Sequence, residues 1–169
     1  MFLTHFTLLH VAIRLAGIGA GLVVVYGLRA SKRLDGRTAA FLATTVATSV
    51  AGFLFPFHRL LPSHAVGIAS LLVLPVAIYG RCGRHLAGSW RLTNVVTAMI
   101  ALHLNVFVLI VQAFLKVPPL KALAPTQSEP PFALTQGVIL ALFVLLTVIA
   151  VTRFRAEQPR QDRLSVQPA

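Results

Sequence analysis

The stretch at residues 55–67, FPFHRLLPSHAVG, separates two long apolar runs and decides how the chain folds. It carries two histidines, one arginine and two prolines, whereas the runs on either side carry almost no charge. A membrane-spanning helix needs about 20 mainly apolar residues, so the pattern predicts two spans joined by a turn at a water interface. The chain start, with His5 and His10, is then expected on the same side of the membrane.

The composition of the whole chain agrees with this interpretation. Its 169 residues are 57% hydrophobic and only 11% charged, whereas a soluble domain carries about a quarter charged residues. The mean hydropathy of +0.83 arises from apolar runs separated by short charged loops. We therefore predict an all-α fold, an integral membrane helical bundle that leaves no room for a separate soluble domain.

Five apolar segments are predicted to be transmembrane helices, at residues 6–28, 38–57, 64–80, 92–115 and 132–152. With their connections they form a transmembrane domain over residues 1–152. Gly17 and Gly21 in the first segment have the spacing that lets two helix backbones approach closely, and packing within the chain is favoured over a dimer contact. The polar tail, residues 153–169, is predicted to be disordered.

Basic residues fall unevenly on the two sides of this bundle. The net charge is +11, from 15 basic and 4 acidic residues, and 11 of the bases lie in residues 29–37, 81–91 and the tail. Positive loops stay cytoplasmic, which predicts an N-terminus outside and a C-terminus in the cytoplasm. Bases placed beside spans indicate contact with the lipid bilayer and its anionic headgroups rather than with nucleic acid.

The chain lacks the common motifs of enzyme chemistry. It contains no GxxxxGK[ST], HExxH, CxxC or GxSxG pattern, and Cys82 is its single cysteine. None of the predicted spans contains Asp or Glu, which argues against a transporter coupled to protons or sodium. The sequence therefore favours a protein that is not an enzyme.

Histidines and one arginine are the remaining candidates for a site. Arg14 lies one helical turn beyond His10 on the same face, and a charge at the bilayer centre costs about 2.5–3.5 kcal/mol. His64 follows the helix start at Pro62-Ser63, so it is expected at a depth similar to that of His10. Because neutral imidazoles can ligate iron and Arg14 could pair with a propionate, we predict a cofactor site of His10, His64 and Arg14. Haem b is the candidate cofactor, and no metal ion is assigned.

An interpretation without a ligand stays open for the same residues. His10 would then bond to a neighbouring carbonyl while Arg14 extends to the lipid headgroups. His5 and His58 are expected near the surface, and His103 separately within the bundle.

Two further features bear on a site without defining one. Thr45, Thr48, Ser49 and Gly52 share one narrow polar face of the second segment, which suits close helix packing or, alternatively, a substrate path. The proline-rich loop at residues 116–131 is expected over the outer face, as a connector or as a lid. Glu129 is then expected near the histidines.

The stretches FPFHRLLPSHAVGI, ALHLNVFVLIVQAF and KALAPTQSEPPF resemble a group of small bacterial multi-pass integral-membrane proteins that have no assigned function. The resemblance covers nearly the whole chain. It implies the bacterial inner (plasma) membrane and brings no activity, cofactor or site residue.

Three hypotheses of function follow. The most specific is a haem- or metal-linked redox accessory protein that uses the outer histidines. The alternatives are a non-catalytic assembly or packing subunit, in contact with itself or with another membrane protein, and a small permease.

Overall fold

The computed structural model describes residues 2–30, 32, 34–53, 62–86 and 88–153, with side chains from His5 in the first helix and from Ala65 in the third. The described chain is helical and contains no strand, which confirms the all-α prediction for this part. Its elements are α1 Phe2–Arg29, α2 Asp35–Gly52, α3 Pro62–Ile78, the π-helical turn η1 Tyr79–Gly83, α4 Trp90–Lys116, α5 Pro118–Leu123 and α6 Pro130–Arg153.

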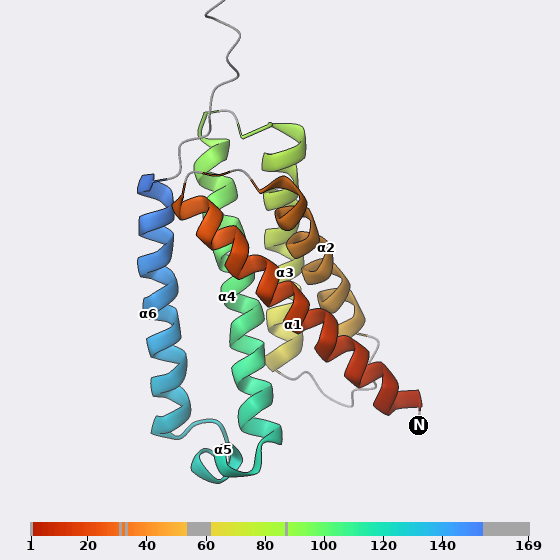
Figure 1. Cartoon of the computed structure of the whole chain (residues 1–169). Helices are drawn as coiled ribbons and strands as arrows, with labels where there is room; N and C mark the ends of the chain where they lie inside the picture. Colours follow the sequence, from red (N-terminus) through yellow and green to blue (C-terminus); the bar gives the residue numbers. More distant parts are fainter. Residues whose placement is uncertain (1, 31, 33, 54–61, 87, 154–169) are drawn as a thin grey trace, which may run out of the picture.

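Figure 1 shows the long helices α1, α2, α3, α4 and α6 packed side by side, with α1 crossing the others obliquely. Helix α4 packs against α1, α3 and α6, while α2 packs against α1 and α3. One end of the bundle, which we call the N-terminal end, contains the start of α1, the end of α2, the start of α3, the end of α4 and the short helix α5. The end of α1, η1 and the start of α4 lie at the opposite end.

Four of the helices are long and apolar enough to cross a membrane, which makes the chain a membrane protein by this criterion. They cover His5–Arg29, Ala65–Gly83, Trp90–Lys116 and Pro130–Arg153. Helix α2 is not among them, since its 18 residues include Asp35, Arg37 and five hydroxyl side chains. Each of the five predicted segments overlaps a helix. Four of them meet the criterion for a membrane span, and the span predicted at α2 stays a prediction. Arg153, the first residue of the predicted tail, ends α6, while residues 154–169 and the turn at residues 55–61 with His58 lie outside the described residues.

The core of the bundle forms where small residues of α1 let two other helices approach. A Cβ atom on Gly21 would lie 2.5 Å from Leu102 Cδ1 of α4 and 3.0 Å from the Phe41 ring of α2. One on Gly17 would lie 2.8 Å from Thr44 Oγ1 of α2. The expected packing of these glycines within the chain is therefore observed. Phe41, Leu102, Leu74 and Met99 are the largest fully buried side chains around this contact.

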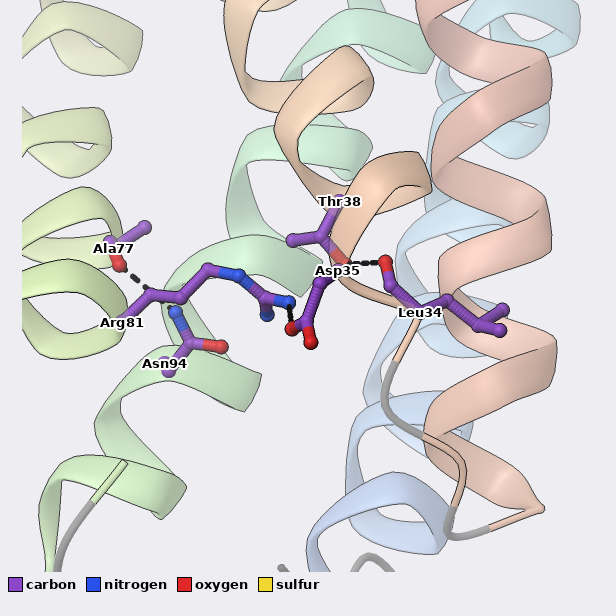
Figure 2. A network of polar contacts seen from close by, with 6 residues as sticks. All are labelled: Leu34, Asp35, Thr38, Ala77, Arg81 and Asn94. Atoms are coloured by element: carbon purple, nitrogen blue, oxygen red, sulfur yellow. Dashed lines mark hydrogen bonds and ion pairs between the residues drawn. The ribbon is translucent and has the colours of Figure 1, made fainter. Parts of the chain in front are cut away.

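Polar contacts tie α2, α3 and α4 together at the opposite end (Figure 2). The buried Asn94 Nδ2 donates to the Ala77 carbonyl over 2.8 Å, two residues before η1 begins. Arg81 of η1 forms an ion pair with Asp35, the first residue of α2. Asp35, one of the four acidic residues of the chain, thus pairs with a base of this strongly basic end.

The proline-rich connection contains α5, a helix of six residues that begins with Pro118 and Pro119. Proline suits a first helical turn because the amide it lacks would have no partner there. This agrees with the expectation that the segment forms no long helix.

Candidate functional site

A cavity of about 540 Å³ lies between α1, α2, α3 and α4 toward the N-terminal end. This volume falls within the range of about 300–1,000 Å³ that is usual for small-molecule sites. Polar side chains from all four helices reach it, namely Thr7, His10, Arg14, Thr48, Ser49, Ser70, Asn105, Gln112 and Lys116. Apolar residues such as Val11, Val66 and Leu109 complete its wall. The cavity therefore offers a polar set of groups within a largely apolar bundle.

Helix α1 brings two of the predicted site residues together on this wall. His10 and Arg14 are four residues apart and so occupy one face of the helix. Arg14 Nη2 donates a hydrogen bond to His10 Nε2 over 3.3 Å. A guanidinium has only donors, so the imidazole accepts through Nε2 and carries its proton on Nδ1. His10 is thereby a neutral ring that holds the Arg14 head group in place.

The remaining donors of Arg14 are not satisfied by the described residues. Its Nε and Nη1 atoms are buried, and neither has a hydrogen-bond acceptor among them. More than about 90% of buried polar groups in proteins have a partner, and an unmet buried donor costs about 1–3 kcal/mol. Arg14 is therefore the most unusual polar group of the cavity.

The third predicted residue, His64, has its backbone in the first turn of α3, and its side chain lies outside the described atoms. Val66 and Gly67, two and three residues later, line the cavity. The placement of His64 in the site stays a prediction.

The other histidines described lie apart from the cavity. His5 is exposed near the start of α1. The His103 ring packs against Phe143 and Phe107 with ring centroids 5.2 and 6.4 Å away. Its separate position within the bundle agrees with the expectation, although its described contacts are aromatic rather than hydrogen bonds. Within the part of the chain that the structure describes, no group of three or more His, Cys, Asp or Glu side chains could hold a metal ion.

The polar face of α2 divides between packing and the cavity. Thr45 Oγ1 donates to the Phe41 carbonyl over 2.7 Å and accepts from Asn105 Nδ2 over 2.9 Å. Thr48, Ser49 and Gly52 line the cavity further along the helix. The expected close packing is thus observed at Thr45, and a substrate path along this face stays a prediction.

Helix α4 contributes three polar cavity residues that the sequence analysis did not assign to a site. Asn105, Gln112 and Lys116 follow an i, i+7, i+11 spacing, which places them on one face of the helix. That spacing indicates a polar face on one helix, but it does not predict which other helices pack against this face. Lys116 is the last residue of α4 and is exposed, so it lines the cavity at the N-terminal end.

The loop after α5 is held by its own polar groups. Glu129 accepts hydrogen bonds from the Thr126 amide and hydroxyl, at 3.1 and 2.9 Å, and from the Ser128 amide at 3.1 Å. Desolvation is the largest single influence and raises the pKa of Glu129, but the hydrogen bonds together outweigh it and hold the pKa below its ordinary value. Gln127 Nε2 donates to the Val111 carbonyl of α4 over 2.8 Å. Glu129 does not line the cavity, and the lid function stays a prediction.

Comparisons with models of known protein families, with characterised proteins and with solved structures found no match. The function of the cavity is therefore inferred from the geometry and chemistry of its own residues.

Proposed function

We propose that this protein is a five-span protein of the bacterial inner membrane that binds a small amphipathic molecule in the cavity between α1 and α4. Support for the fifth span comes from α2, which packs against two of the apolar helices. The described bases at the opposite end are Arg29, Lys32, Arg37, Arg81, Arg84, Arg91 and Arg153. They support an N-terminus outside and a C-terminus in the cytoplasm, because positive segments stay inside.

The observation that carries the binding function is the cavity itself. Ligand pockets are mostly apolar hollows with a few convergent polar groups, and this one combines both within helices that suit a bilayer. Two buried nitrogens of Arg14, Nε and Nη1, have no hydrogen-bond acceptor among the described residues, so the cavity wall has polar groups that a ligand can satisfy. A bound molecule with one polar and one apolar part could form hydrogen bonds with the polar lining residues and pack against the apolar ones.

A haem-linked role is the second candidate, because His10 lines the cavity. Its Nε2 atom accepts a hydrogen bond from Arg14, so that contact would have to break before Nε2 could ligate iron. An assembly role gains no specific support, since lipid accounts equally well for the exposed apolar face of α6.

The test is to identify what the protein retains. The wild-type chain is purified in a mild detergent, extracted with organic solvent, and the extract is analysed by mass spectrometry and by absorbance. We expect about one retained molecule per chain in wild type, and loss of it in Ser70→Phe, which fills the cavity. Leu72→Phe is the matched control, because Leu72 lies on α3 with 71% of its surface exposed.

If neither the wild type nor Leu72→Phe retains a bound molecule, the proposal is contradicted. A Soret band in the wild type that Ser70→Phe and His10→Ala both abolish would favour the haem-linked alternative.

A further inference from the structure

We propose that the molecule bound in the cavity carries an anionic oxygen group, a carboxylate or a phosphate, and that Arg14 binds this group. The inference rests on the proposed binding function and names the chemical class of its ligand.

The position of the Arg14 head group is the first argument. Arg14 lies nine residues after His5, which corresponds to a depth of about 14 Å along the apolar part of α1. Its Nη2 bonds to His10 on the cavity wall, and its Nε and Nη1 atoms are buried within the protein. A side chain that reached the lipid headgroups would expose these nitrogens. The guanidinium therefore ends inside the bundle, where a charge requires a counter-charge.

The chain does not supply that counter-charge within its described part. The three groups of the cavity that can be cationic are His10, Arg14 and Lys116, and its described lining contains no carboxylate. Asp35 pairs with Arg81 at the opposite end, and Glu129 bonds within its own loop. A ligand that brings a negative charge would complete the site.

The shape of the guanidinium selects the kind of anion. Its nitrogens form a planar fork that matches two oxygens of a carboxylate or phosphate, and such charge-assisted bonds are roughly twice as strong as neutral ones. His10 accepts a hydrogen bond from Nη2 and so fixes the plane of the guanidinium on the cavity wall. Thr48, Ser49 and Gln112 offer further polar partners, and the apolar wall suits an acyl chain.

The experiment compares three probes with the same acyl chain on delipidated full-length protein in a non-ionic detergent. Isothermal titration measures the binding of oleate, of dioleoyl phosphatidate and of the uncharged oleyl alcohol. We expect at least one of the two anions to bind about ten-fold more tightly than oleyl alcohol. Preference for oleate identifies a carboxylate as the recognised group, and preference for phosphatidate identifies a lipid phosphate.

Variants then assign the discrimination to Arg14. Arg14→Gln is expected to remove the preference for the anion, and Arg14→Lys to retain part of it, since lysine keeps the charge without the fork. Arg29→Gln is the matched control, because it makes the same change of charge on the same helix at the opposite end, about 22 Å away. Circular dichroism and size-exclusion chromatography check that each variant is folded.

Equal binding of oleate and oleyl alcohol, unchanged in Arg14→Gln, would overturn the anion inference while leaving the cavity as a binding site. Failure of all three probes to bind would also overturn it. The proposed function would still stand if the extraction experiment yielded a different, uncharged molecule, and would fall only if nothing were retained.

Discussion

Asn105 of α4 donates a hydrogen bond to Thr45 Oγ1 of α2 over 2.9 Å. Both residues are buried, with 7% and 1% of their surfaces exposed. The Thr45 hydroxyl in turn donates a hydrogen bond to the Phe41 carbonyl. Because Asn105 also lines the cavity, this pair fixes the position of α2 against α4 beside the candidate site.

A double-mutant cycle should measure this contact. Asn105→Leu and Thr45→Val each remove one partner, and we expect a coupling free energy of about 0.6 kcal/mol, up to about 1.7 kcal/mol. Unfolding in detergent, followed by circular dichroism, gives the four stabilities. Strict additivity of the two substitutions would show that the bond contributes nothing to stability.

Removing the Arg14 charge should stabilise the protein when no ligand is bound. Two buried nitrogens of Arg14 have no acceptor in the described part of the chain, so Arg14→Leu is expected to raise the free energy of unfolding by about 1–3 kcal/mol. Thermal unfolding of delipidated samples checks this, with Arg29→Leu expected to stay within about 0.5 kcal/mol of wild type. A less stable Arg14→Leu protein would mean that Arg14 has a structural partner.

Two glycines of α1 should respond oppositely to the same substitution. Gly21→Ala would place a Cβ atom 2.5 Å from Leu102 Cδ1, and we expect a loss of about 1–3 kcal/mol from overpacking. Gly19 is exposed and has nothing within 4 Å of its Cβ position. Gly19→Ala is therefore expected to be neutral or to stabilise by up to about 1 kcal/mol. Equal effects at both positions in thermal unfolding would contradict the α1 contact with α2 and α4.

The loop network around Glu129 should depend on pH. Its hydrogen bonds hold the pKa of Glu129 below the ordinary value of 4.5, so the folded state binds the proton less tightly than the unfolded state. The contribution of the network is present above the ordinary pKa and is lost as the pH falls through the lower folded value. Amide chemical shifts of Thr126 and Ser128 in a ¹⁵N-labelled sample should follow this titration. A midpoint at or above 4.5 would contradict it, and Glu129→Gln should abolish the transition.

The topology can be tested by reporter fusions at residue 35 and at the C-terminus. With five spans and an outer N-terminus, both reporters should lie in the cytoplasm. If α2 does not cross the membrane, one of the two reporters lies on the opposite side, in the periplasm. A periplasmic signal from either fusion therefore contradicts the proposed arrangement.

The sequence by itself determined the helices and the local geometry within each of them. Apolar runs of the right length predicted the four helices that are long and apolar enough to cross a membrane, because backbone groups in a bilayer must be bonded within their own segment. The four-residue spacing of His10 and Arg14 placed them on one face, and the small size of Gly17 and Gly21 predicted a close helix contact. The prolines of residues 116–131 excluded a long helix there.

Only the tertiary structure decided which helix faces meet. Periodicity shows that Asn105, Gln112 and Lys116 share a face of α4, but not that this face meets Arg14 of α1 around one cavity. Likewise, the sequence gives no sign that Asn94 bonds to the Ala77 carbonyl or that Arg81 pairs with Asp35, 46 residues earlier. The physical reason is that helix geometry depends on neighbours three or four residues away, whereas the lateral arrangement of helices depends on packing between distant segments.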